Sequence, residues 1–303
     1  MFYIFVANLL ASSVKLLFLS KSFSKIASID WSLLKRMVFY SLPLAIAGFA
    51  GIINETLDRI LLKQILFNPE NPSSLDYAEA QVGVYSASYK LAMLVTILLQ
   101  AYRYAAEPFF FNQMKNENRN KIYSQIMNVF IAVVCSVFLL VTLNIDVFKY
   151  FIQNEAYWVG LKVVPILLMA NIFLGIYFNQ SIWYKLSGKT QFGAYIAITG
   201  AVLTVVINVL YIPKYGYMAS AWATLIVYFV QMVISYLLGQ KHYPIPYNLK
   251  KVVLYIGLAL VLFGVSPYLQ MHNFTLNIIV QNCLLLIFIG VVYVLEWKRK
   301  SVI

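Results

Sequence analysis

Residues 85–111, "YSASYKLAMLVTILLQAYRYAAEPFFF", form a stretch that is long and apolar enough to cross a lipid bilayer. A spanning helix needs about 20 consecutive, predominantly apolar residues. The stretch nevertheless carries Lys90, Gln100, Arg103 and Glu107. Because a charge at the centre of a bilayer costs at least about 2.5 kcal/mol, these groups indicate a helix that faces a bundle interior or a water-filled cavity.

The composition of the whole chain is typical of a membrane protein. Of 303 residues, 62% are hydrophobic and 11% are charged, and the mean hydropathy is +0.77. Soluble domains average roughly 45–50% apolar and 25% charged residues. The sequence therefore predicts an all-α membrane protein in contact with membrane lipids. The net charge of +12 does not indicate a nucleic-acid partner, because the basic residues stand in short groups between apolar runs.

Nine apolar stretches have the length of a membrane span. They lie at about 1–20, 37–66, 81–111, 122–143, 161–184, 191–212, 217–238, 252–269 and 277–296. Alternate connectors between them are rich in Lys and Arg, whereas the opposite set includes the acidic loop 67–80. By the positive-inside rule, the basic connectors and the C-terminus are expected to face the cytoplasm.

This orientation places the N-terminus outside. The first residues, "MFYIFVANLL", have neither a charged leader nor a cleavage site. One interpretation is a reverse signal-anchor with Lys15 and Lys21 held inside. The interpretation that we favour is that the chain is the C-terminal part of a longer transporter.

Several ionisable residues are predicted to share one depth in the membrane. With a rise of about 1.5 Å per residue, Lys90 lies roughly 13 Å from the outer end of its span. On the preceding span, Glu55, Asp58 and Arg59 lie roughly 10–17 Å deep by the same rise. We expect Asp58 or Glu55 to pair with Lys90, while Glu55 and Arg59 are also spaced to pair within one helix. Arg103 and Glu107 repeat that spacing nearer the cytoplasmic end.

Two interpretations of this polar cluster are open. It can be a set of buried ion pairs that fixes the register of the helices. It can instead wall a polar cavity for an anionic, hydroxyl-rich substrate. The residues expected around such a cavity are Arg59, Lys90, Arg103, Asn54, Gln100, Asn179 and Gln180.

The sequence indicates no metal site, cofactor or catalytic dyad. Cys135 and Cys283 lie inside apolar spans, and His242 and His272 lie in connectors expected on opposite sides of the membrane. The stretch "SGKT" at 187–190 lacks the earlier glycine of a phosphate-binding loop. An enzyme is not expected, because the longest outer connectors contain no histidine. A membrane polymerase or acyltransferase acting on lipid-linked glycans is the less favoured alternative.

Three stretches resemble one transporter family. They are "MVFYSLPLAIAGFAGIINETLDRILLKQIL" at 37–66, "GVYSASYKLAMLVTILLQAYRYAAEPFFF" at 83–111, and "WYKLSGKTQFGAYIAITGAVLTVVINVLYIPKYGYMASAWATLIVY" at 183–228. Together they are similar to the second lobe of bacterial polysaccharide flippases, in the multidrug/oligosaccharidyl-lipid/polysaccharide exporter superfamily. Within the third stretch, Pro213 and Gly216 predict a tight outer turn. The small residues after it permit close helix packing.

The resemblance implies two six-helix lobes around a central cavity. Residues 1–20 would be the last helix of a truncated first lobe, and 21–36 a basic cytoplasmic linker. Residues 37–238 would form the second lobe, and 252–296 two additional helices. The missing first lobe, or a partner subunit, would complete the transporter in the bacterial cytoplasmic membrane.

The resemblance also implies a function, namely the movement of undecaprenyl-diphosphate-linked oligosaccharide to the outer leaflet by alternating access, for surface polysaccharides such as O-antigen or capsule. Arg59, Lys90 and Arg103 would hold the diphosphate, with arginine preferred for bidentate contact. Glu55 and Asp58 would couple transport to a proton or sodium gradient. Alternatives are a drug or peptidoglycan-precursor exporter of the same superfamily, or a structural membrane subunit.

Overall fold

The computed structural model describes residues 2–23 and 30–297 of the chain. All regular elements within these residues are helical. Nine helical segments among them are long and apolar enough to cross a membrane. The expected all-α membrane protein with nine spans is therefore confirmed for the described part of the chain.

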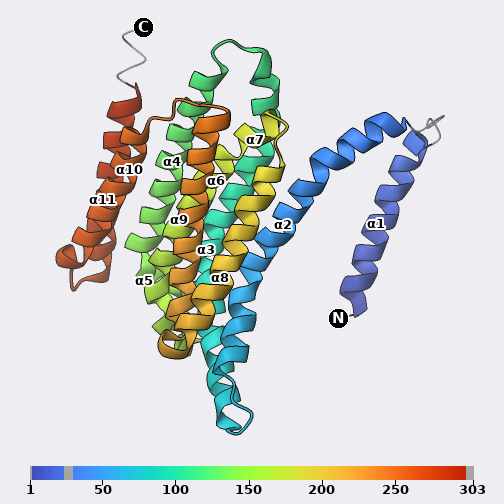
Figure 1. The fold of residues 1–303 in the computed structure, drawn as a ribbon. Coiled ribbons are helices and arrows are strands. Elements are labelled where there is room, and N and C mark those ends of the chain that lie inside the picture. Colours follow the sequence, from blue (N-terminus) through green and yellow to red (C-terminus); the bar gives the residue numbers. More distant parts are fainter. Residues whose placement is uncertain (1, 24–29, 298–303) are drawn as a thin grey trace. The chain divides into compact units, whose positions relative to one another are not determined.

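The main helices are the following (Figure 1): α1 Phe2–Phe23, α2 Trp31–Leu66, α3 Ser73–Asn112, α4 Arg119–Leu143, α6 Val164–Gln180, α8 Gln191–Tyr215, α9 Tyr217–His242, α10 Leu249–Val265 and α11 Phe274–Trp297. Shorter elements lie between them: η1 Gln113–Lys115, α5 Ile145–Phe148, η2 Lys149–Phe151, η3 Glu155–Val163, α7 Ile182–Leu186 and η4 Ser266–Leu269.

Of the expected basic linker at 21–36, residues 21–23 belong to α1 and residues 31–36 belong to α2. Residues 24–29 lie outside the described residues. The early start of α2 has a local cause, since Oδ1 of Asp30 accepts hydrogen bonds from the backbone N–H groups of Ser32 at 2.9 Å and Leu33 at 3.0 Å. An aspartate before the first turn satisfies N–H groups that otherwise lack partners, and so it favours helix initiation.

The chain divides into two compact units, Met1–Leu42 and Pro43–Ile303. The first unit holds α1 and the start of α2, and most of its described side chains are exposed. The second unit is a helical bundle with a continuous hydrophobic core. All of the side chains discussed below belong to this second unit.

Helix α6 is the most buried helix of the bundle and packs against α9, α3 and α4. Its sequence explains this position, because Val164–Gln180 is apolar on nearly every face, as is typical of a helix surrounded by other helices. Gly175 permits a close approach, since a Cβ atom there would lie 2.6 Å from the Phe130 ring of α4 and 2.7 Å from Leu99 of α3.

The turn between α8 and α9 depends on one glycine. Gly216 has φ of +54°, a value that side chains disfavour. A Cβ atom there would also lie 2.5 Å from Oε1 of Gln81, which accepts a hydrogen bond from the Tyr217 backbone N–H at 3.2 Å. The predicted turn is confirmed at Gly216, but Pro213 lies inside α8 and not in the turn.

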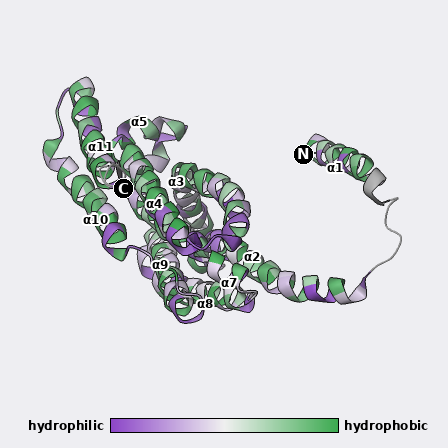
Figure 2. Ribbon diagram, turned by 90° about the horizontal axis from the view of Figure 1, so that it is seen from above, coloured by the Kyte–Doolittle hydropathy of each residue, from purple (hydrophilic) through white to green (hydrophobic). Residues whose placement is uncertain are grey.

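Helices α10 and α11 pack against α4 at the edge of the bundle. Hydrophobic residues predominate along both helices (Figure 2). Many of these side chains are exposed, including Val253, Val261 and Leu286. Such apolar surfaces on spanning helices are suited to contact with lipid.

Candidate functional site

Asp58 is the most completely buried acidic residue described, with 2% of its surface exposed. Three side chains donate hydrogen bonds to its carboxylate. The Tyr85 hydroxyl of α3 and the Thr224 hydroxyl of α9 approach Oδ2 at 2.8 and 2.9 Å, and Nδ2 of Asn208 on α8 approaches Oδ1 at 3.0 Å. Asp58 on α2 therefore joins four helices through one carboxylate.

The hydrogen bonds continue beyond Asp58. The Ser220 hydroxyl donates to Oδ1 of Asn208 at 2.8 Å, and the Thr204 hydroxyl lies 3.1 Å from Oδ1 of Asn54. All these groups are buried. We call this set the Asp58 network; its members are Asn54, Asp58, Tyr85, Thr204, Asn208, Ser220 and Thr224.

Helical spacing explains why the network forms between these helices. Residues four apart lie on one face of a helix. Asn54 and Asp58 have this spacing on α2, Thr204 and Asn208 on α8, and Ser220 and Thr224 on α9. Three helices thus present matching polar faces at the network.

Gly200 makes room for polar side chains beside the network. A Cβ atom at this position would lie 2.1 Å from Nε2 of Gln231 and 3.0 Å from Nδ2 of Asn54. Gln231 is buried and donates from Nε2 to the Ile196 carbonyl at 3.3 Å. The absence of a side chain at Gly200 therefore lets α2, α8 and α9 bring these amides together.

The expected pairing of Lys90 with Asp58 or Glu55 is wrong. Lys90 is exposed, and no ion pair joins it to either carboxylate in the part of the chain described. Helix geometry explains the difference, because α3 packs through the face that carries Tyr85 and Ser88. At about 100° per residue, position 90 lies on nearly the opposite side from position 88.

Arg59 contacts aromatic rings and a backbone carbonyl. Its guanidinium carbon lies 4.6 Å from the centre of the Tyr89 ring and 5.8 Å from that of Tyr85. Its Nη1 donates to the Glu55 backbone carbonyl at 2.8 Å. The described residues contain no ion pair between the Arg59 and Glu55 side chains, so that expected pairing is also wrong.

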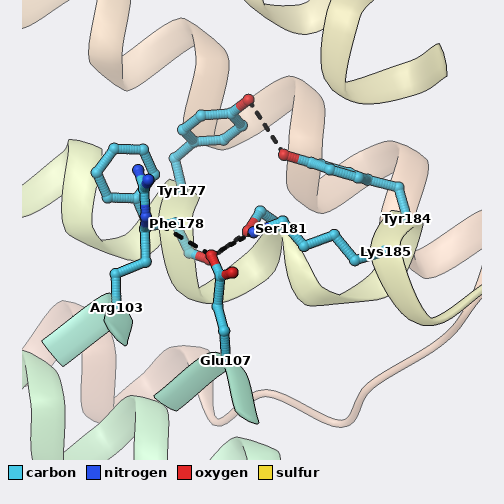
Figure 3. Close-up of polar contacts among 7 residues, drawn as sticks. All are labelled: Arg103, Glu107, Tyr177, Phe178, Ser181, Tyr184 and Lys185. Carbon is cyan, nitrogen blue, oxygen red and sulfur yellow. Dashed lines mark hydrogen bonds and ion pairs between the residues drawn. The ribbon is translucent and has the colours of Figure 1, made fainter. Parts of the chain in front are cut away.

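A second polar group links α3 to α7 (Figure 3). Nε of Arg103 lies 3.6 Å from Oε1 of Glu107, and Nζ of Lys185 donates to the same oxygen. The Arg103 guanidinium also lies over the Phe178 ring, with 5.1 Å between the guanidinium carbon and the ring centre. Two cations share one carboxylate, so this Arg103–Glu107–Lys185 group has a net positive charge.

The remaining expected cavity residues lie apart from the Asp58 network. Nδ2 of buried Asn179 donates to the Tyr102 hydroxyl at 2.6 Å. Gln180 is buried and its Oε1 has no hydrogen-bond partner, while Gln100 is half-buried. Within the described residues no hydrogen bond connects these three amides to Asp58. The polar residues of the sequence therefore form separate groups along the bundle.

Sequence reasoning named Asn54 and Asp58 but missed the other members of the network. These are Tyr85, Thr204, Asn208, Ser220 and Thr224, and none of them carries a charge. The available signal was a pair of polar residues four positions apart within an apolar span. It occurs at 54 and 58, at 204 and 208, and at 220 and 224.

Comparison of the chain with protein-family models, with curated proteins and with solved structures gives no match. No group of three or more His, Cys, Asp or Glu side chains suited to a metal ion occurs in the described residues. A fold does not by itself identify an activity, which depends on the chemistry of a site. Among the described residues, the Asp58 network and the Arg103–Glu107–Lys185 group offer such chemistry.

Proposed function

We propose that the chain belongs to a proton-coupled transporter that moves undecaprenyl-diphosphate-linked oligosaccharide across the bacterial cytoplasmic membrane by alternating access. The observation that carries the proposal is the burial of Asp58 among hydroxyl and amide groups of four spanning helices. Ionisable residues inside a membrane characteristically mark ion or substrate pathways. The substrate class comes from the resemblance of residues 37–238 to polysaccharide flippases.

The hydrogen bonds around Asp58 are compatible with either protonation state. The Thr224 hydroxyl has one proton to donate, and two acceptors lie 2.9 Å from it, Oδ2 of Asp58 and the Ser220 carbonyl. When Asp58 is ionised, Thr224 donates to it. When Asp58 is protonated at Oδ2, the acid donates to Thr224, which donates to Ser220. Proton exchange needs no displacement of heavy atoms, and this favours a proton over sodium as the coupling ion.

The cations provide the proposed contacts to the diphosphate. Arg103 and Lys185 share one carboxylate and therefore keep a net positive charge. Arginine is suited to bidentate contact with phosphate, while lysine acts as a point charge. Arg59 is half-buried and is held over the ring of the buried Tyr89. Lys90 is exposed and available to a substrate that approaches along α3.

Transport into proteoliposomes tests the proposal. The chain is purified as its native gene produces it, so that any first lobe or partner subunit is present, and it is given a fluorescent undecaprenyl-diphosphate oligosaccharide. We expect glycan movement that responds to a pH gradient and not to a sodium gradient, and that is lost in Asp58→Asn. The control is Asp146→Asn, since Asp146 lies in the short helix α5 with half of its side chain exposed.

The other outcomes have defined meanings. Transport that responds only to a sodium gradient would mean that sodium, and not the proton, is the coupling ion. Movement of a drug or a peptidoglycan precursor in place of the glycan would assign a different exporter of the superfamily. Glycan movement by Asp58→Asn with an unchanged pH dependence would remove Asp58 from coupling.

A further inference from the structure

A cavity of about 920 Å³ opens beside α4, away from the Asp58 network. Residues of α3, α4, the segment 243–248, α10 and α11 line it. Its lining includes residues near the start of α4, the start of α10 and the end of α11. Figure 1 shows these three helix ends at the same end of the bundle. Its volume is within the usual range of ligand sites, about 300–1,000 Å³.

Three charged side chains are part of the cavity lining. Lys121 lies in the first turn of α4 and is exposed, with no side-chain ion pair among the described residues. Lys251 forms an ion pair with Glu296 at 2.6 Å, and both line the cavity. With two cations and one carboxylate, the lining has a net positive charge. It is therefore complementary to an anion.

A buried amide lies further along α4. Asn128 lines the cavity with only 6% of its surface exposed. The cavity thus offers cations for a phosphate near the start of α4 and a polar side chain deeper along the helix.

An apolar groove continues from the cavity. A second hollow of about 500 Å³ lies between α4 and α11 and is lined almost entirely by apolar side chains, such as Leu140 and Ile289. It shares Val129, Val133 and Glu296 with the first cavity, so the two are continuous. Together they form an amphipathic site, polar where the helices are connected and apolar along the spans.

We propose that this site binds one anionic glycerophospholipid. The phosphate would lie at Lys121, the head group would extend outward from it, and one acyl chain would pass Asn128 into the groove between α4 and α11. Basic pockets between spanning helices are established places for anionic head groups. This inference requires only that the chain spans a membrane, and it is independent of the transport activity proposed above.

Native mass spectrometry of the purified full chain tests the site, with titration of phosphatidylglycerol or phosphatidylcholine. We expect one tightly retained phosphatidylglycerol and no retained phosphatidylcholine. Lys121→Gln should weaken retention roughly fivefold, because one basic residue near an anionic head group contributes about 1 kcal/mol. Val133→Trp, which fills the groove, should abolish retention.

Matched controls separate the site from general contact with lipid. Lys115→Gln removes an exposed cation from η1, outside the cavity lining, and Val202→Trp enlarges an exposed side chain of α8. Both controls should retain the lipid, and all four variants should melt within a few degrees of the parent chain. Equal retention of phosphatidylcholine, equal loss in the controls, no effect of Lys121→Gln, or displacement by a polyprenyl phosphate would each overturn the proposal.

Discussion

Oδ2 of Asp58 on α2 lies 2.9 Å from the Thr224 hydroxyl on α9, although 166 positions separate the two residues. The Tyr85 hydroxyl reaches the same oxygen at 2.8 Å. A carboxylate that accepts donors from several helices couples the positions of those helices to its own charge. A change of protonation at Asp58 would therefore act on the contacts among α2, α3, α8 and α9 together.

Asp58→Asn should preserve the fold, whereas Asp58→Ala should not. An asparagine has the same shape, and its amide can donate to the Tyr85 and Thr224 oxygens while its carbonyl accepts from Asn208. Alanine removes this acceptor. Thr224 and Asn208 keep backbone carbonyl acceptors, whereas the buried Tyr85 hydroxyl loses its close acceptor, at about 1–3 kcal/mol. The measurement is the melting temperature in detergent. Equal destabilisation by both variants would mean that the negative charge itself holds the helices together.

Gly216→Ala should destabilise the protein more than Gly188→Ala. Both glycines have positive φ, +54° and +70°, so each alanine suffers backbone strain of about 1 kcal/mol or more. Only at Gly216 would the new Cβ atom also meet Gln81, at 2.5 Å, whereas Gly188 faces open space. Thermal unfolding of the two variants isolates the steric contribution. In the double variant Gly216→Ala with Gln81→Ala, part of the lost stability should return, because the steric contact is gone. If no stability returns, the whole loss in Gly216→Ala comes from the positive φ.

The spans could be predicted from the sequence because each is a long apolar run, and length with hydrophobicity decides whether a helix fits a bilayer. The ends of the helices were harder to predict from the sequence, because they depend on local contacts. Asp30 caps α2 earlier than the apolar pattern indicates. Pro213 continues α8, and the chain reverses only at Gly216.

The candidate site could be predicted only in part. Depth along the helices predicted a buried Asp58, and the structure buries it, but depth does not specify which way a side chain points around the helix. Lys90 was expected at the same depth as Asp58. It lies on a different face of α3 from Tyr85, which contacts Asp58. The actual partners, Asn208 and Thr224, are uncharged, and they come from helices about 150 residues further along the chain. Tertiary packing, and not charge pairing, brings them to Asp58.

Glu107→Gln should lower the melting temperature more than Glu79→Gln. Glu107 faces both Arg103 and Lys185, and only 14% of the Lys185 side chain is exposed. Glu79 pairs with Lys63, and both of those side chains are at least half exposed, at 55% and 50%. Exposed ion pairs contribute about 0–1 kcal/mol. Arg103 and Glu107 are 38% and 37% exposed, so loss of the Glu107 charge should cost more than this because Lys185 is largely buried, and less than the several kcal/mol of a fully buried pair. The two melting curves, recorded at low and high salt, provide the comparison.

The salt dependence gives this prediction a second test. Salt should reduce the small contribution of the Lys63–Glu79 pair and leave that of the Glu107 group largely unchanged, because partly buried charges are less screened. Equal effects of the two substitutions at both salt concentrations would show that the Arg103–Glu107–Lys185 group behaves as a surface pair and does not fix α7 against α3.

Thr224→Val and Thr224→Ser should separate the role of the hydroxyl from that of packing. Valine has nearly the shape of threonine but cannot donate to Asp58 or to the Ser220 carbonyl, whereas serine keeps the hydroxyl and loses only a methyl group. We expect Thr224→Val to lower stability by about 1–3 kcal/mol, the cost of a hydrogen bond lost from a buried charged group. Transport by Thr224→Val should lose its response to the pH gradient, while Thr224→Ser should keep both stability and response.

The pH response is the decisive readout for Thr224, because a purely structural hydroxyl would change the melting temperature without changing how transport depends on the proton gradient. The change of hydrogen bonds that accompanies protonation of Asp58 requires an oxygen at position 224. It donates to ionised Asp58, and when Asp58 is protonated it accepts from the acid and donates to the Ser220 carbonyl. Only a hydroxyl does both. A Thr224→Val protein that is fully pH-responsive, even if less stable, would therefore show that coupling does not need this change, and would leave Thr224 as a packing residue between α2 and α9.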